Sequence, residues 1–181
     1  MSAEGFSTIR TRQIADLGFL NVTIRDVGTP SGETVERVVI EHPGAAAVVP
    51  LIDGDIILIE QYRAPIEERL LEIPAGKLDD QVNDPGHTAG RELEEETGYT
   101  AGHLEHLTDL LTTVGFSDEV ISIYLATGLS EGVRTPIGEE EEDASIVRMP
   151  FSEAVAAVED GRIRDAKTVA GILLAARRGS S

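Results

Sequence analysis

The sequence contains no cysteine and no tryptophan, and aromatic residues make up only 4% of its 181 residues. Without cysteine, disulfide bonds and thiolate metal sites are excluded. Basic residues are also few, because 15 Lys and Arg stand against 33 Asp and Glu, which gives a formal net charge of −18. Nucleic-acid-binding surfaces and anionic membranes require basic clusters, so we expect neither as a partner. An anionic substrate would have to be met by local cations or by a metal ion.

Long apolar runs are missing too. No segment approaches the roughly eighteen consecutive apolar residues of a transmembrane helix, and the N-terminus lacks a basic region followed by an apolar stretch. We therefore expect a soluble, cytoplasmic protein. The hydrophobic content of 41% is sufficient for the core of one domain or of one domain with an extension.

The apolar periodicity predicts strands in the first half of the chain and helices mainly in the second half. Residues 6–12 show little pattern and could form an arm, and residues 131–143 read as an acidic loop. Asp53-Gly54 between two apolar runs predicts a tight hairpin. The pattern favours an α/β fold with a mixed sheet and helices on both faces. The expected strands are 19–27, 35–41, 45–52, 56–62, 70–75, 104–111, 119–126 and 145–149, and the expected helices are 84–97, 152–159 and 165–177.

The acidic segment that ends the first helix is the strongest functional signal. Successive residues of a helix advance by about 100°, so Glu92, Glu95 and Glu96 form one ridge and Glu94 points to the opposite face. Like charges at these spacings repel by about 0.2–0.5 kcal/mol per pair, unless solvent or a cation offsets the repulsion. Carboxylate oxygens are ligands that Mg²⁺ prefers, so the ridge is either a metal site or a solvated surface. Arg91 is spaced to pair with Glu95.

Residues 76–99 resemble the Nudix box, whose pattern is Gly-x5-Glu-x7-Arg-Glu-aliphatic-x-Glu-Glu-x-Gly-aliphatic. Residues 91–98 match at every defined position, and Tyr99 replaces the last aliphatic residue. The loop before Arg91 carries one extra residue, and Asn83 stands in place of the first Glu. The resemblance implies a Nudix-type α/β/α sandwich with a mixed sheet and an N-terminal β-hairpin extension. It also implies that Mg²⁺ or Mn²⁺ is bound by the backbone carbonyl of Ala75 and by Glu92, Glu95 and Glu96.

Stretches outside the box are similar to the ADP-ribose pyrophosphatase branch of this family, namely residues 41–45, 59–63, 71–76 and 115–119. This resemblance implies metal-dependent hydrolysis of the pyrophosphate bond of ADP-ribose to AMP and ribose 5-phosphate. Val114 stands where that branch usually has proline, so another nucleoside diphosphate sugar or a dinucleotide remains open as the preferred substrate. A non-catalytic module that binds ADP-ribose is an alternative of another class. The intact glutamates of the box favour an enzyme.

The same resemblance suggests roles for residues on the strands and loops. Arg63 would contact a phosphate of the substrate, with an exposed surface arginine as the alternative. Arg37 and Glu41 match positions near the adenosine or its ribose, and Glu119 matches a position near the terminal ribose. The general base would come from the glutamates at 139–142, with Glu140 preferred and Glu142 second, although each could simply be solvated.

The resemblance also predicts the organisation of the chain. Residues 1–42 would form a β-strand arm or hairpin that packs across a homodimer, and residues 43–181 would form the Nudix hydrolase domain.

Overall fold

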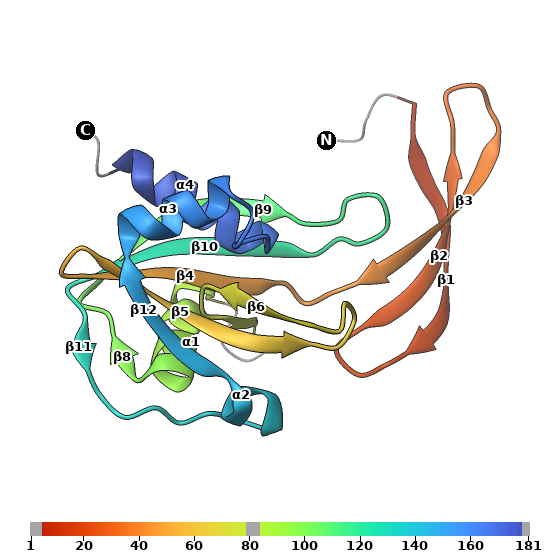
Figure 1. The fold of residues 1–181 in the computed structure, drawn as a ribbon. Helices are drawn as coiled ribbons and strands as arrows, with labels where there is room; N and C mark the ends of the chain where they lie inside the picture. Colours follow the sequence, from red (N-terminus) through yellow and green to blue (C-terminus); the bar gives the residue numbers. More distant parts are fainter. Residues whose placement is uncertain (1–4, 79–83, 179–181) are drawn as a thin grey trace. The chain divides into compact units, whose positions relative to one another are not determined.

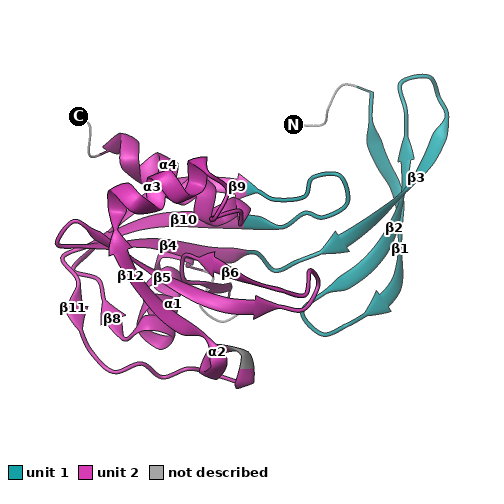
Figure 2. Ribbon diagram, viewed as in Figure 1, with its two compact units in different colours: residues 1–44, 111–120 teal, residues 45–110, 121–181 magenta. Residues whose placement is uncertain are grey.

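The computed structural model describes residues 5–78 and 84–178, except for the side chain of Glu140 (Figure 1). Asn83, the residue that departs from the Nudix box, lies outside the described residues. The chain divides into two compact units (Figure 2). Unit 1 comprises residues 1–44 and 111–120, and unit 2 comprises residues 45–110 and 121–181.

Unit 1 is built on a three-stranded antiparallel sheet in the order β1 (Ser7–Asp16), β2 (Asn21–Gly28) and β3 (Thr34–Glu41). β2 and β3 are the predicted N-terminal hairpin, with Asn21 opposite Glu41. β1 was not predicted from the sequence. Its register against β2 shifts between Thr8 and Arg10 and again between Gln13 and Ala15, and such bulges interrupt the two-residue alternation by which a strand is recognised.

The main sheet of unit 2 has the strand order β12 (Ser145–Pro150), β5 (Asp55–Arg63), β4 (Ala45–Ile52), β10 (Val120–Thr127) and β9 (His103–Leu111). β4 and β10 are parallel, whereas β5 is antiparallel to β4 and to β12. The sheet is therefore mixed, as predicted. β6 (Glu68–Glu72) adds to β5 and β7 (Ala75–Lys77) adds to β4, where one strand over 70–75 was expected. β8 (Tyr99–Thr100) and β11 (Ser130–Glu131) form a separate short pair.

The turn between β4 and β5 is the predicted hairpin. Asp53 and Gly54 have φ angles of 54° and 86°, and Leu51 and Ile52 pair with Ile56 and Asp55 across it. Positive φ at both central residues is the requirement of a type I′ turn, which Asp-Gly meets at little cost.

Helices cover both faces of β4, which confirms the predicted layers. Ala46 and Val48 pack with the apolar side of α1 (Pro85–Thr97). Ala47 and Val49 pack in a second cluster with α3 (Phe151–Glu159) and α4 (Ala166–Arg178). Because successive side chains of a strand point to opposite faces, α1 lies on one side of the sheet and the other two helices lie on the other. Among the described residues, no helix is long and apolar enough to cross a membrane.

Candidate functional site

The acidic ridge is carried by α1, whose ends are fixed by local capping. The Asp84 carboxylate accepts a hydrogen bond from the Gly86 N–H at 2.9 Å, and Pro85 starts the helix. At the other end Gly98 adopts φ 79° and donates its N–H to the Glu94 carbonyl. These are the N-cap and the left-handed C-cap that set where a helix begins and ends. The caps therefore fix which turn of α1 carries each glutamate.

Glu92 and Glu96 are buried, with 7% and 4% of their surface exposed. Both face β7. The Ala75 N–H donates to a carboxylate oxygen of Glu96 at 2.9 Å, and a Cβ placed on Gly76 would lie 1.9 Å from Oε1 of Glu92. Two carboxylates of the Nudix-box pattern thus lie against a strand backbone that carries no side chain at Gly76. The alternative of a solvated surface does not hold for these two residues, because β7 covers them.

Arg91 connects the other members of the ridge. Its guanidinium donates to Oε1 of Glu92 at 2.6 Å and pairs with Glu95 one helical turn later. The predicted Arg91–Glu95 pair is present, and Glu94 is exposed, as the helical geometry requires. Arg91 therefore offsets the charges of Glu92 and Glu95, whereas the Glu96 carboxylate accepts a hydrogen bond from the neutral backbone amide of Ala75.

The electrostatics of these carboxylates suit a cation. Burial raises the pKa of Glu96 to about 8, and the neighbouring charges of Glu92 and Glu141 add to the rise. Burial also raises the pKa of Glu92, against the influence of Arg91. Burying like charges together is costly unless a counter-charge is present. A divalent ion that takes oxygen ligands would supply that charge, so the residues fit the metal that the Nudix box implies.

The ligand set is not assembled as a cage, however. Over residues 5–78 and 84–178, no three His, Cys, Asp or Glu side chains converge closely enough to hold a metal ion. Glu95 is turned to Arg91, and the contact of Ala75 with Glu96 is made by its N–H. The ligand role of the Ala75 carbonyl stays a prediction.

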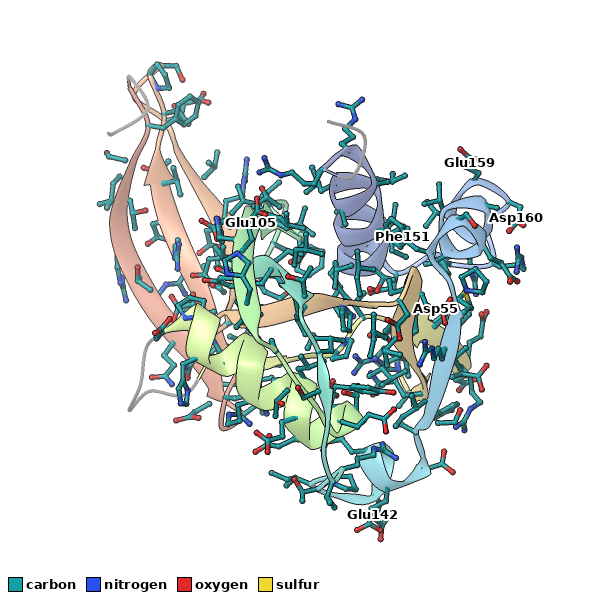
Figure 3. The ribbon with its side chains drawn as sticks, turned by 90° about the vertical axis from the view of Figure 1, so that its left-hand side faces the viewer. Asp55, Glu105, Glu142, Phe151, Glu159 and Asp160 are labelled. Carbon is teal, nitrogen blue, oxygen red and sulfur yellow. The ribbon has the colours of Figure 1, made fainter. Side chains whose placement is uncertain are left out.

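The acidic segment predicted as a loop forms a one-turn helix, α2 (Glu139–Asp143). Glu141 is half-buried, and its charge contributes to the raised pKa of both Glu92 and Glu96. Its carboxylate also accepts the Ile137 N–H at 2.6 Å. Glu142 is exposed and points outward from α2 (Figure 3). The side chain of Glu140 lies outside the described part of the structure. The choice of Glu140, with Glu142 second, stays a prediction, since a run of identical residues gives no sign of which one faces the site.

Arg63 is the last residue of β5 and forms an ion pair with Glu72. Its Nε and Nη2 each donate to a different oxygen of Glu72 at 2.7 Å, which is a bidentate arrangement. The Glu72 side chain is 1% exposed and also pairs with the buried Lys167 of α4. The Arg63 side chain is 39% exposed, so part of the guanidinium reaches solvent. Its predicted contact with a substrate phosphate stays a prediction.

The other predicted substrate-binding residues belong to unit 1. Glu41 accepts a hydrogen bond from Nη2 of Arg25 at 2.8 Å, and the same nitrogen lies 3.2 Å from Asp118. Glu119 accepts the Thr112 hydroxyl at 2.6 Å. Arg37 is exposed on β3. The structure thus links Glu41 to Asp118 through Arg25, which the sequence did not single out.

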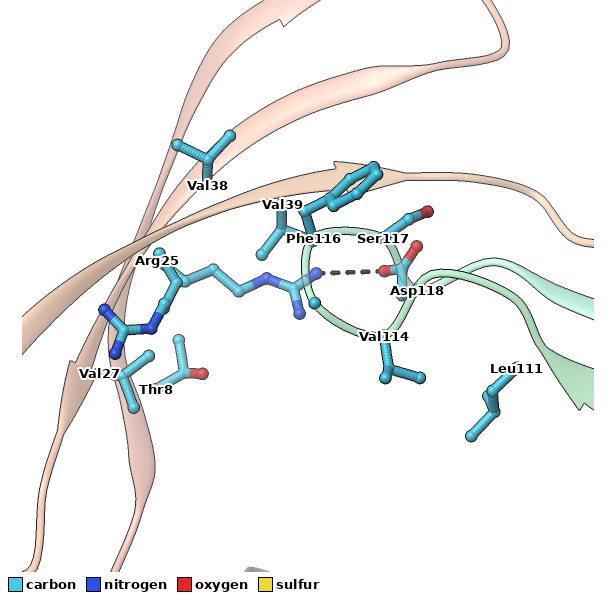
Figure 4. Close-up of a pocket in the computed structure, with 12 residues that line it drawn as sticks. Thr8, Arg25, Val27, Val38, Val39, Leu111, Val114, Phe116, Ser117 and Asp118 are labelled. Atoms are coloured by element: carbon cyan, nitrogen blue, oxygen red, sulfur yellow. Dashed lines mark hydrogen bonds and ion pairs between the residues drawn. The ribbon is translucent and has the colours of Figure 1, made fainter.

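A hollow of about 520 Å³ lies within unit 1 (Figure 4). Arg25, Val39, Val114 and Phe116 are among its lining residues, and Arg37 contributes from β3. Phe116 is 53% exposed and Val114 is 74% exposed, so their apolar surfaces are open to a ligand. Apolar walls with a few charged groups are typical of sites for small organic molecules.

Comparison with known proteins agrees with this geometry. Residues 41–171 match the sequence model of the NUDIX domain. The chain is 40% identical to the methanol dehydrogenase activator of Bacillus methanolicus over 91% of this chain and 89% of that protein. It is 39% identical to the ADP-ribose pyrophosphatase of Bacillus subtilis (strain 168), with the same coverage. The crystal structure of an ADP compounds hydrolase superposes with a TM-score of 0.81 at 25% identity and covers all of this chain and 98% of the other.

One assignment follows from the capped helix with its buried glutamates, the glycine of β7 beneath them, the sheet with helices on both faces and the match over residues 41–171. This chain belongs to the Nudix family.

Proposed function

We propose that this protein hydrolyses the pyrophosphate bond of ADP-ribose to AMP and ribose 5-phosphate, with Mg²⁺ or Mn²⁺ as cofactor. The observation that carries the proposal is the pair of buried carboxylates, Glu92 and Glu96, against the backbone of β7. A module that only bound a ligand would gain nothing from burying like charges side by side. The names of the Bacillus subtilis relative and of the superposed ADP compounds hydrolase support the choice of substrate.

The chain provides the oxygen ligands for the metal. Glu92 and Glu96, joined by Glu95 and the Ala75 carbonyl, would hold the ion, which when bound supplies positive charge that polarises the phosphoryl oxygens. Arg91 holds Glu92 and Glu95 in defined positions. The role of these residues is therefore to hold positive charge next to a linkage that is itself negatively charged.

We assign the general base to Glu141. A base must lie within hydrogen-bonding reach of the attacking water, and among the described side chains of α2 that of Glu141 is half-buried and acts through its charge on both Glu92 and Glu96. Its carboxylate would take the proton from water as the new phosphorus–oxygen bond forms, while the bond from that phosphorus to the bridging oxygen breaks and the bridging oxygen leaves with the other phosphate. Glu140 is the alternative on the same turn.

We propose roles in substrate recognition for residues of each unit, taken by itself. The Arg63 guanidinium is held by its two hydrogen bonds to Glu72. It would bind a phosphate through the part that faces solvent. The hollow in unit 1 offers the Phe116 ring and valine side chains to a heteroaromatic base, with Arg37 for polar groups of the adenosine. Following the family resemblance, Glu41 would also meet the adenosine, and Glu119 the terminal ribose. We further propose that the protein is a homodimer in the cytoplasm and that it packs through residues 1–42. Static light scattering of the full chain would give the mass of the assembly.

A second candidate is a Nudix hydrolase for another nucleoside diphosphate sugar or a dinucleotide. Val114 lines the hollow in place of the branch's usual proline, and the Bacillus methanolicus relative bears the name of a dehydrogenase activator. A change in the wall of a pocket alters which substrate is preferred without altering the chemistry at the metal.

The test is hydrolysis of ADP-ribose beside ADP-glucose, NADH and diadenosine polyphosphates, each with Mg²⁺, Mn²⁺ or EDTA. We expect AMP release that depends on metal and is fastest from ADP-ribose, and its loss in Glu96→Gln while the protein stays folded. Faster turnover of another compound would move the assignment to the second candidate. No turnover with any compound, together with ADP-ribose binding, would indicate a binding module.

The base is tested by changing three neighbouring residues one at a time. Glu141→Gln should lower kcat by about 10²–10⁴-fold, the usual contribution of a general base, with KM changed little. Glu142→Gln is the matched control on the exposed side of α2 and should leave kcat near that of the unchanged protein. If Glu140→Gln causes the loss and Glu141→Gln does not, the base is Glu140.

A further inference from the structure

Arg134 is the residue through which α2 is attached to the metal-binding helix. Its Nε donates to the backbone carbonyl of Glu96 at 2.6 Å, and its Nη1 donates to the carbonyl of Ala144 at 3.0 Å. Its Nη2 donates to the carbonyl of Glu141. One guanidinium thus joins the last turn of α1 to the middle and the end of α2.

The carbonyls at these positions need an outside donor. The last four carbonyls of a helix have no partner within it, and a cation near the C-terminus is favoured by the helix dipole. The Thr135 N–H donates a hydrogen bond to the neighbouring carbonyl of Glu95 at 3.1 Å, and the Gly132 N–H donates to the carbonyl of Gly98 at 2.7 Å. The segment that leads into α2 therefore runs along the end of α1, with Arg134 at its centre.

Among the described contacts, few others hold α2 in place. It contains five residues, and its N-cap Gly138 makes no side-chain capping bond. A helix of this length is not stable by itself. From the other side, Arg69 of β6 donates to the carboxylate of Asp143 at 2.7 Å and to its carbonyl at 3.0 Å. Arg69 is attached to the end of α2, whereas Arg134 contacts the Glu141 backbone itself.

We propose that Arg134 is a positioning residue that holds the Glu141 carboxylate at its working distance from the site on α1. This inference rests on the proposed function, because it takes Glu141 as the base. The planar fork of arginine reaches three carbonyls at once, which the single ammonium of lysine cannot do. The backbone contacted on α1 belongs to Glu96, so base and candidate metal ligand are related through one side chain.

Kinetics of Arg134→Gln and Arg134→Lys test the proposal. A displacement of about 1 Å can cost 10²-fold in rate, so we expect Arg134→Gln to lower kcat by about 10- to 100-fold with KM within about twofold. Arg134→Lys should fall between it and the unchanged protein. Arg148→Gln is the matched control, since Arg148 pairs with Asp55 and Asp53 beside the β4–β5 turn and interacts with Tyr99, and none of these residues belongs to α2. Unchanged kcat in Arg134→Gln would overturn the proposal.

A double-mutant cycle separates positioning from general support of the fold. If Arg134 acts through Glu141, adding Arg134→Gln to Glu141→Gln should lower kcat no further, since coupled residues are not additive. A full additional loss in the double mutant would overturn the proposal.

Amide hydrogen exchange gives a readout that does not depend on activity. In Arg134→Gln, amides of residues 137–144 should exchange faster while those of α1 keep their protection, because local opening reports local contacts. If the unchanged protein hydrolyses none of the compounds, the proposed function fails, and unaltered exchange in Arg134→Gln would separately overturn the attachment of α2.

Discussion

Among single residues, Gly76 is constrained by a side chain from another element. Its missing Cβ leaves room for the Glu92 carboxylate, which would otherwise be 1.9 Å away. The contacting atoms are the end of a flexible side chain, so an alanine here would push the carboxylate aside and leave the strand in place. The space over Gly76 is therefore part of the proposed metal site.

Gly76→Ala should lower metal affinity and kcat by about 10- to 100-fold, the range seen when groups that support a ligand are lost. The melting temperature should change little. Gly90→Ala on α1 is the matched control, because a Cβ there meets only Leu104 at an ordinary 3.6 Å. Measuring the hydrolysis rate as a function of Mn²⁺ concentration would give both the metal affinity and kcat. Normal metal affinity in Gly76→Ala would contradict the role of this contact.

The sequence predicted some residue contacts and could not predict others. The Arg91–Glu95 pair follows from helical spacing alone. Burial of Glu92 and Glu96 depends on β7, and the backbone carbonyl of Glu141 is contacted by Arg134. Neither neighbour is adjacent in the chain. The pairing of Arg63 with Glu72 was missed for the same reason, since it depends on how β5, β6 and α4 meet.

At the scale of elements, α1 must begin at a fixed residue for its glutamates to face β7. Asp84→Ala removes the side-chain acceptor for the Gly86 N–H. It should destabilise the protein by about 1 kcal/mol, within the 0.5–2 kcal/mol range for N-caps. Urea unfolding would measure it. Asp84→Asn keeps an acceptor at the same position and should cost much less, and equal losses in both variants would rule out capping as the cause.

Elements were predicted well where periodicity and capping agree, as for α1 and the β4–β5 hairpin. Two were not. β1 is bulged, so its apolar residues do not alternate regularly. α2 is a run of acidic residues without an apolar face, and it is held by two arginines from other parts of the chain. Local sequence carries no signal for a helix that exists because of distant contacts.

At the scale of the whole molecule, Glu72 joins β6 to β5 and α4. Burial alone would raise its pKa, but hydrogen bonds and charges from Arg63 and Lys167 outweigh burial and lower the pKa below its ordinary 4.5. Lys167 also lies 3.0 Å from Asp165, whose carboxylate accepts the Thr168 N–H. The network thus connects the sheet with the helix that covers it.

This network predicts acid sensitivity. Because the pKa of Glu72 is lower in the folded than in the unfolded protein, the stability it contributes is complete above about pH 4.5 and is lost as pH falls through the folded-state pKa. Glu72→Gln should cost about 3 kcal/mol at pH 7, since it leaves a buried cation with one partner fewer. It should also reduce the difference in stability between pH 7 and pH 4.

Urea unfolding at the two pH values would measure both effects. Glu105→Gln is the matched control, because Glu105 pairs with Arg178 at the surface, where such pairs contribute about 0–1 kcal/mol. An unaltered pH dependence in Glu72→Gln would show that the acid sensitivity comes from other carboxylates.

The parallel pairing of β4 with β10 has a consequence for synthesis of the chain on the ribosome. Residues 45–50 pair with residues 121–126, so one neighbour of the central strand is translated long after the strand itself. Until then the nascent chain exposes an unpaired strand edge, which is a template for association with other chains. A ribosome that stalls before β10 would leave a product with α1 already made and β4 open on that side. Such a product should be a substrate for chaperones and proteases.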